Sequence, residues 1–144
     1  MVVRAERVVT VPAPPEKVWE FIADPERRAS PISVVEDFEI LDDGVAVWHI
    51  ALPIPLVNRT IAIETRERTR EQPTYVEFAG KSKVLSVVGQ HTLTEVNGST
   101  ELTNRFIVDG KAPGVERFFK RQMDDEFDNL ERALEEFLGL TYEQ

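Results

Sequence analysis

Three polar residues of this sequence fall at positions where apolar side chains are expected, and they are the first candidates for chemistry. Glu126 lies within the apolar stripe of a predicted helix, between Val115 and Phe119 when residues are placed at about 100° intervals. His91 and Asn104 face each other on the apolar side of a predicted hairpin. Because a buried, unpaired carboxylate costs several kcal/mol, we expect Glu126 to face a partner, an internal water or a hollow, or to hold a proton.

These residues are compatible with two kinds of chemistry and with a structural role. In a mostly apolar pocket they would be the few hydrogen-bonding groups that orient a ligand. His91 and Glu126 could instead form a general acid–base pair in a cyclase or dehydratase, but no nucleophile motif supports this and we predict no catalytic residue. In the structural alternative, His91 and Asn104 satisfy each other and Glu126 meets an arginine or a water. The sequence leaves enzymatic activity open and favours a protein that is not an enzyme.

Other sites for chemistry find little support. Two histidines and scattered acidic residues offer too few ligands for a metal, and His49 is expected to face solvent, away from His91. The Gly-Lys-Ser tripeptide at 80–82 resembles the end of a phosphate-binding loop, but the required first glycine would fall at Tyr75. We therefore expect neither a metal nor a cofactor.

The hairpin that carries His91 and Asn104 has a clear turn signal. Asn97-Gly98 is typical of a two-residue type I′ turn, which fixes the register of the two strands at 83–96 and 99–109. The predicted pairs on the apolar face are Leu93 with Leu102, His91 with Asn104, Gly89 with Phe106 and Val87 with Val108.

A long amphipathic helix is predicted over residues 114–139. Its roughly 25 residues make a rod of about 37 Å, long enough to lie across a small sheet. Leu130, Leu134 and Phe137 are expected in the core, whereas the part from Val115 to Glu126 is expected to roof a pocket. The apolar positions recur every three or four residues: Val115, Phe119, Met123, Phe127, Leu130, Leu134 and Phe137.

The rest of the chain reads as one strand, two short helices and further strands. The predicted order is a strand at 4–11, helices at 16–23 and 25–30, strands at 32–41 and 45–52, an apolar connection at 52–57, and strands at 59–70 and 74–80. Of the two registers open to the hairpin around Asp42-Asp43-Gly44, we favour the one that pairs Phe38 with Trp48 and Ile40 with Ala46.

Length, composition and net charge limit the classes of protein to which this chain can belong. The 144 residues, 42% hydrophobic, fit one domain over 1–144. No apolar run is long enough for an integral membrane segment or a signal peptide, so we expect a cytoplasmic protein. The net charge of −9 argues against a nucleic-acid partner and against electrostatic adhesion to anionic lipid. The chain has no cysteine and so no disulfide.

Three stretches carry a resemblance to a known superfamily. They are VPAPPEKVWEFIADPER at 11–27, the Gly-x-His-x-Leu strand that leads through Asn97-Gly98 into ELTNRF, and DGKAPGVERFFKRQM at 109–123. With the order of elements, they resemble the START and birch-pollen-allergen-like (SRPBCC) superfamily. The nearest likeness is to its group of polyketide cyclase-like proteins and G-type subunits of carbon-monoxide dehydrogenase.

This resemblance implies an α+β helix-grip fold. A curved, seven-stranded antiparallel sheet would wrap around the long C-terminal helix, with two short helices between the first two strands. The cavity between sheet and helix would bind a hydrophobic small molecule such as a lipid, a quinone or a polyketide-like compound. The loops at 52–58, 80–84 and 109–114 would share its rim, with 52–57 as a flap. The expected ligand contacts are Trp48, Phe78, His91, Asn104, Phe106, Phe119, Gln122, Met123 and Glu126.

Three functions follow as hypotheses. The first is a carrier or sensor of a hydrophobic small molecule. The second is a cyclase or dehydratase that uses His91 and Glu126. The third is an accessory protein that docks on a larger oxidoreductase through the flap, so that a protein partner or a homodimer is also considered.

Overall fold

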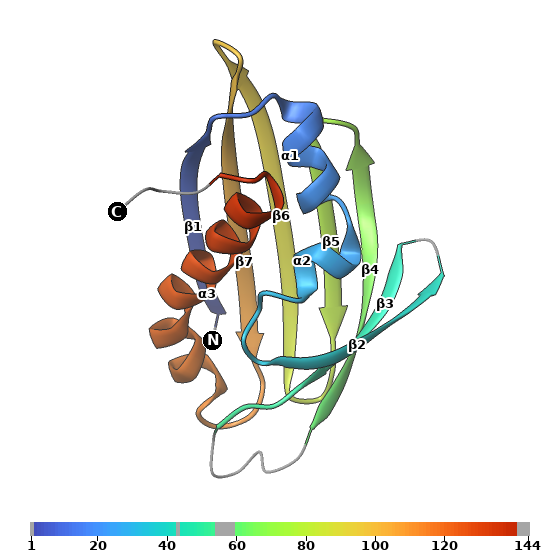
Figure 1. Ribbon diagram of the computed structural model, residues 1–144. Coiled ribbons are helices and arrows are strands. Elements are labelled where there is room, and N and C mark those ends of the chain that lie inside the picture. Colours follow the sequence, from blue (N-terminus) through green and yellow to red (C-terminus); the bar gives the residue numbers. More distant parts are fainter. Residues whose placement is uncertain (1, 43, 54–59, 141–144) are drawn as a thin grey trace.

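The computed structural model describes residues 2–42, 44–53 and 60–140 (Figure 1). Strands and helices follow one another in the order that the sequence predicts. In chain order they are β1 (Val2–Val11), α1 (Pro15–Ile22), α2 (Pro25–Ala29), β2 (Val35–Asp42), β3 (Val45–Ile50), β4 (Ile61–Glu71), β5 (Tyr75–Lys81), β6 (Leu85–Val96), β7 (Ser99–Gly110) and α3 (Val115–Phe137).

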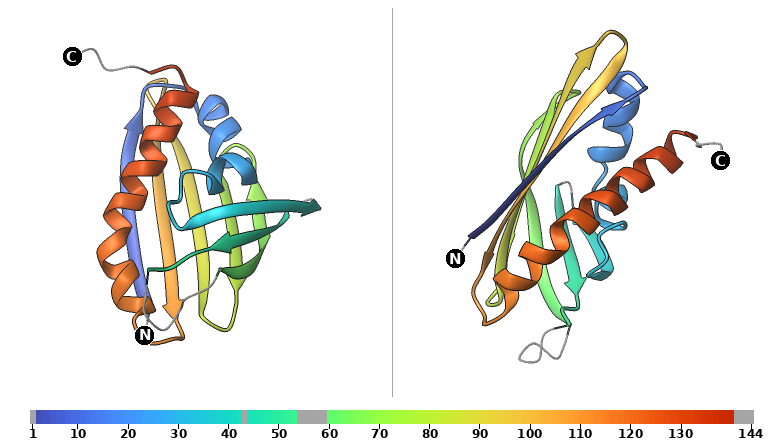
Figure 2. Two further views of the ribbon diagram at one scale, coloured as in Figure 1. Left: turned by 60° about the horizontal axis from the view of Figure 1, so that its bottom comes forward. Right: turned by 90° about the vertical axis from the view of Figure 1, so that its left-hand side faces the viewer.

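The seven strands form one antiparallel sheet in the order β1-β7-β6-β5-β4-β3-β2. The sheet is curved, and all three helices lie on its concave side (Figure 2). α3 crosses β1 and β7, whereas α1 and α2 lie beside it over the middle of the sheet (Figure 1). The predicted α+β helix-grip fold is therefore confirmed.

The β6–β7 hairpin has the predicted register. Asn97 and Gly98 have φ of 53° and 84°, the positive values that a type I′ turn requires. His91 consequently pairs with Asn104, and Gly89 with Phe106. Side chains alternate along each strand, so these positions point toward the helices and their neighbours point outward.

The β2–β3 hairpin follows the favoured register, with Phe38 opposite Trp48 and Ile40 opposite Ala46. The predicted start of β2 at Ile32 is wrong, because residues 32–34 form a turn. The N–H of Ile32 bonds to the carbonyl of Ala29 at 3.1 Å, and the N–H of Val35 bonds to that of Ile32 at 3.0 Å. This turn faces α3 and becomes one wall of the site below.

Two short helices cover the middle of the sheet. Pro15 begins α1, where its missing N–H costs nothing. Asp24 caps α2, because its Oδ1 accepts from the N–H groups of Glu26 at 2.9 Å and Arg27 at 3.2 Å. Val18 and Trp19 of α1 point into the core.

The second half of α3 packs on the core and is bonded to the edge of the sheet. Leu130 and Leu134 are buried as predicted. At the sheet edge, Arg7 of β1 donates to Asp128 at 2.6 Å. Phe137, which was expected in the core, is 36% exposed because it falls in the last turn of α3, where Arg27 lies 4.5 Å from the centre of its ring.

The predicted rim of the cavity is only partly described. The N–H of Lys111 in the β7–α3 loop donates to the carbonyl of Val84 in the β5–β6 turn at 2.8 Å. These two loops and the start of α3 therefore lie at one end of the molecule (Figure 1). Of the predicted flap at 52–57, residues 54–57 lie outside the described residues.

Gly89 allows an aromatic layer to form against β6. A Cβ at this position would lie 2.2 Å from the ring of Phe78, so only glycine leaves room for that ring. Phe78 in turn packs against Trp48, with ring centroids 5.4 Å apart. The position of Trp48, which lines the site described next, thus depends on Gly89.

Candidate ligand-binding site

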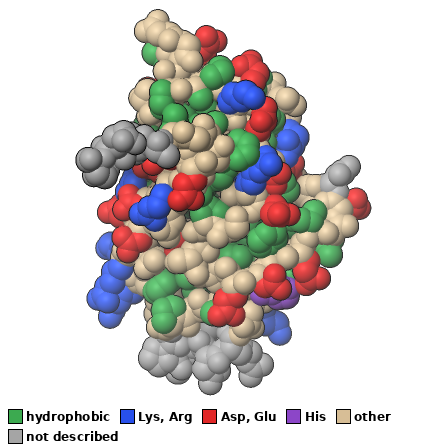
Figure 3. Space-filling model, viewed as in Figure 1, with side chains coloured by type: hydrophobic (Ala, Val, Ile, Leu, Met, Phe, Trp, Pro, Cys, Tyr) green, Lys and Arg blue, Asp and Glu red, His purple; other side chains and the backbone are tan. Residues whose placement is uncertain are grey.

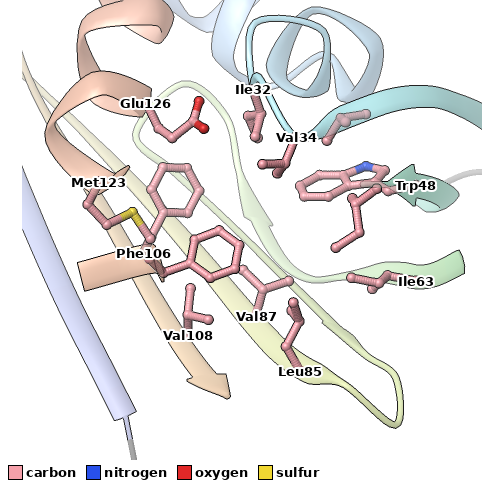
Figure 4. A pocket seen from close by; sticks show the side chains of 13 residues that line it. Ile32, Val34, Trp48, Ile63, Leu85, Val87, Phe106, Val108, Met123 and Glu126 are labelled. Atoms are coloured by element: carbon pink, nitrogen blue, oxygen red, sulfur yellow. The ribbon is translucent and has the colours of Figure 1, made fainter. Parts of the chain in front are cut away.

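A cavity of about 40 Å³ lies between the first half of α3 and the concave face of the sheet (Figure 4). Twelve of its thirteen lining side chains are apolar and the other is a carboxylate. They are Ile32, Val34, Val35, Trp48, Ile50, Ile63, Leu85, Val87, Phe106, Val108, Phe119, Met123 and Glu126.

Regular periodicities bring most of these side chains together. Trp48 and Ile50 alternate along β3, as Leu85 and Val87 do along β6, so each pair points to the concave face. On α3 the lining residues Phe119, Met123 and Glu126 are four and three positions apart, which places them on one helical face. The α2–β2 turn supplies the remaining wall.

Glu126 joins two walls of this cavity. Its side chain is 4% exposed. Oε1 accepts from the N–H of Ser33 at 2.9 Å, and Oε2 accepts from the hydroxyl of Ser33 at 2.5 Å. The amides of Gln122 and Asn129 add longer contacts of 3.3 and 3.4 Å. The expected arginine is therefore wrong as the partner of Glu126 among the described residues, because a serine of the α2–β2 turn takes that place.

The Ser33–Glu126 contact leaves the cavity without a strong polar group. The carboxylate oxygens point toward the segment that carries Ile32 and away from Phe106 (Figure 4). Both oxygens are already hydrogen-bonded, so they need no further donor. An apolar cavity of this kind gives water few partners and favours apolar occupants.

His91 and Asn104 satisfy each other in part, as the structural alternative predicts. Both are fully buried, and Nδ1 of His91 lies 2.7 Å from Oδ1 of Asn104. Burial, together with the nearby positive charge of Arg28, lowers the pKa of His91 to about 3. The imidazole is therefore neutral, and we assign its proton to Nδ1, which donates to Asn104. Nε2 of His91 and Nδ2 of Asn104 have no hydrogen-bond partner among the described residues.

The His91–Asn104 pair does not line the cavity but lies behind its lining side chains. The ring of His91 lies between Phe78 and Phe106, at centroid distances of 6.2 and 5.7 Å. Only Phe106 of these three rings lines the cavity. His91 and Asn104 therefore support the wall of the cavity from behind.

Arg28 is a buried cation that the sequence analysis did not identify. It is 4% exposed, and its Nη1 donates to the carbonyl of Ile22 at 3.1 Å. Its guanidinium lies 4.6 Å from the centre of the Phe78 ring and 3.6 Å from a carboxylate oxygen of Glu67. Burial lowers the pKa of Arg28 to about 10, so it remains charged at neutral pH. An amphipathic pattern cannot reveal it, because Arg28 lies in a five-residue helix.

The structure separates the nine expected ligand contacts into two groups. Five line the cavity: Trp48, Phe106, Phe119, Met123 and Glu126. Phe78 and His91 contact lining side chains from behind, Asn104 is paired with His91, and Gln122 flanks the Ser33–Glu126 contact. Ile63 and Val87 were detectable as inward strand positions, whereas no sequence signal identified the α2–β2 turn. As ligand contacts, all nine stay predictions.

The described residues can also be examined for a metal site and for a membrane-spanning helix. Within residues 2–42, 44–53 and 60–140, no group of three or more His, Asp or Glu side chains could hold a metal ion. In the same ranges, no helix has the length and apolarity needed to cross a membrane.

Solved structures with the same fold span nearly the whole chain. A START superfamily protein from Mycobacterium smegmatis aligns with a TM-score of 0.74 and 16% identity, over 96% of this chain and 99% of that one. An aromatase/cyclase from a Streptomyces species gives 0.68 and 18%, over 96% and 93%. A protein from Deinococcus radiodurans gives 0.71 and 22%, over 97% and 99%. At these identities the likeness shows the fold alone.

Sequence comparison shows the family. No curated protein sequence matches the chain. The family model described as polyketide cyclase / dehydrase and lipid transport, however, matches residues 2–135. This match agrees with the helix-grip fold and confirms the superfamily that the sequence motifs indicated. The chain is therefore a member of the polyketide cyclase / dehydrase and lipid transport family.

Proposed function

We propose that this protein binds and carries a hydrophobic small molecule in the cavity between α3 and the sheet. The observation that carries the proposal is the cavity itself, lined by twelve apolar side chains, most of which belong to the buried hydrophobic core. Its ligand would be a lipid, a quinone or a polyketide-like compound. The lipid-transport description of the family supports the same class.

The size of the cavity implies that its walls part when a ligand enters. About 40 Å³ holds only a few water-sized groups, whereas pockets for drug-sized ligands measure about 300–1,000 Å³. The first half of α3 lines the cavity with Phe119 and Met123, and the Ser33–Glu126 hydrogen bonds join it to the opposite wall. Separation of α3 from the α2–β2 turn would enlarge the cavity without unpairing a strand.

The geometry favours carriage over acid–base catalysis by His91 and Glu126. His91 is neutral, fully buried and outside the cavity lining. Glu126 lines the cavity, but its oxygens are hydrogen-bonded to Ser33. A general acid or base must reach the proton that it transfers; His91 lies outside the lining, and both oxygens of Glu126 are occupied by Ser33.

Native mass spectrometry tests the proposal. The purified protein is incubated with a bacterial lipid and quinone extract, exchanged into volatile buffer and weighed with its bound molecules. Val87→Phe fills the cavity, whereas Val88→Phe adds the same side chain on the opposite face of the same strand. We expect adducts on the wild type and Val88→Phe and their loss from Val87→Phe. Equal adducts on both variants, or none on the wild type, would contradict the proposal.

A further inference from the structure

A cluster of unpaired positive charge lies at the end of the molecule where the predicted rim is located. It consists of Lys81, Lys83, Lys111, Arg117, Lys120 and Arg121, which we call the basic end, and all six side chains are exposed. They come from the end of β5 and the β5–β6 turn, the β7–α3 loop and the first two turns of α3. Four of the five lysines of the chain belong to it.

The cations of the basic end differ from those elsewhere in their partners. None of the six forms an ion pair or a side-chain hydrogen bond with a residue that the structure describes. Among the described residues, eight other lysines and arginines do form ion pairs: Arg7, Lys17, Arg27, Arg28, Arg66, Arg68, Arg70 and Arg105. Arg117 also stands in the first turn of α3, where the helix dipole disfavours a cation. The stability of the fold therefore does not explain the basic end.

Because the six cations lie together, net charge is unevenly distributed over the molecule. The six cations, less the neighbouring Asp109 at the end of β7 and Glu116 in the first turn of α3, leave this end of the molecule with +4. The remaining 11 Lys and Arg and 24 Asp and Glu leave the rest of the chain with −13. In Figure 3, Lys and Arg side chains gather at the lower left, over the first turns of α3. An anionic surface would attract this end and repel the remainder, which fixes the orientation of approach.

We propose that the basic end docks the protein on an anionic lipid bilayer, with the first half of α3 and its adjoining loops toward the membrane. Four of the six residues are lysines, which are depleted in protein–protein interfaces but typical of segments that bind anionic lipid. The net charge of −9 had argued against such adhesion, but it averages over two ends of opposite sign. Leu85 and Phe119 of the cavity lining lie next to these cations in sequence, so docking would place the cavity near the bilayer.

Vesicle flotation tests the proposal without any cavity ligand, so its outcome is independent of the function proposed above. Vesicles of phosphatidylcholine alone are compared with vesicles containing about one-third phosphatidylglycerol, at low and physiological ionic strength. We expect binding to the anionic vesicles only, weakened by salt. The triple variant Arg117→Gln, Lys120→Gln and Arg121→Gln should bind about a hundredfold more weakly, since each basic residue near a membrane contributes about a factor of five.

A second triple variant controls for the change in net charge. Lys17→Gln, Arg66→Gln and Arg132→Gln remove three exposed cations from outside the basic end. This variant should bind anionic vesicles within about threefold of the wild type, and circular dichroism verifies that both variants fold. Equal loss in the two triple variants, or no binding by the wild type, would overturn the proposal. Retention on polyglutamate beads without vesicle binding would also overturn it and would indicate an acidic protein partner.

Discussion

The hydroxyl of Ser33 lies 2.5 Å from the carboxylate of Glu126, although 93 residues separate the two in sequence. This contact and the adjacent backbone bond link the α2–β2 turn to the first half of α3. Ile32 and Val34 on one side, and Met123 on the other, line the same cavity. The Ser33–Glu126 contact therefore joins two walls of the cavity, and it explains how a carboxylate is tolerated on the apolar face of α3.

Ser33→Ala tests the energetic contribution of this contact. The variant removes one hydrogen bond to a charged group and leaves a nearly buried carboxylate with one donor fewer. We expect a loss of about 1.5–3 kcal/mol in the free energy of unfolding, measured by urea denaturation. Ser30→Ala, at the exposed end of α2, is the control and should change stability by less than about 0.5 kcal/mol. Equal effects of the two substitutions would show that the Ser33 hydroxyl contributes nothing.

The burial of His91 predicts a specific dependence of stability on pH. The pKa of His91 is about 3 in the folded protein, against 6.5 for an unperturbed histidine. As the pH falls below about 6.5, the unfolded chain binds a proton that the folded protein does not, so stability is lost by up to ~1.4 kcal/mol per pH unit. This contribution is complete above pH 6.5 and is lost progressively down to about 3.

Urea denaturation between about pH 7 and 5 measures this effect. His91→Gln should show a smaller decline in stability with acid than the wild type, whatever its stability at neutral pH. His49→Gln, which removes the histidine that pairs with Glu39 on the outer face of the sheet, controls for histidine loss in general. An unchanged decline in His91→Gln would mean that His91 accepts a proton in the folded protein.

Gly89→Ala is predicted to disturb the aromatic layer behind the cavity. The new Cβ would lie 2.2 Å from the Phe78 ring, so the ring must move and its packing against Trp48 must change. We expect a destabilisation of about 1–3 kcal/mol. Combining Gly89→Ala with Phe78→Leu should cost less than the sum of the two single changes, because the smaller side chain relieves the overlap. Strict additivity would contradict this explanation.

Val87→Ile is predicted to stabilise the protein while obstructing the cavity. The added methyl group enters a space of about 40 Å³ and buries further apolar area. The expected gain is about 0.5–1 kcal/mol in the free energy of unfolding. Val88→Ile, on the opposite face, should have almost no effect. A loss of stability in Val87→Ile would show that the cavity is too small for even one added carbon.

The fold was predictable because a few short sequence motifs, such as turn residues, fix which residues of neighbouring strands pair. Asn97-Gly98 determines the β6–β7 register, which places His91 opposite Asn104. The choice of Phe38 opposite Trp48 was also correct, since it places both apolar residues on one face. The start of β2 was missed because the hydrophobic pattern at 32–34 resembles a strand, whereas backbone hydrogen bonds after α2 form a turn.

The site was predictable only in part, for a different reason. The helical projection of Glu126 correctly indicated its burial, but its partner Ser33 carries no periodic signal and reaches it only through the tertiary fold. The same applies to Arg28, whose burial depends on how α2 packs over Phe78. Cavity volume depends on sheet curvature and side-chain rotamers, which composition and spacing do not specify.

Trp48 offers the most direct measurement of ligand binding, because it lines the cavity. In a Trp19→Phe variant it is the only tryptophan, so its emission reports on this site alone. Titration with an anthracene-labelled fatty acid and with a short-tailed ubiquinone should give saturable energy transfer or quenching by at least one of them. The signal should disappear in Val87→Phe and persist in Val88→Phe. Emission that neither probe changes, or that changes equally in both variants, would contradict the binding of hydrophobic molecules beneath α3.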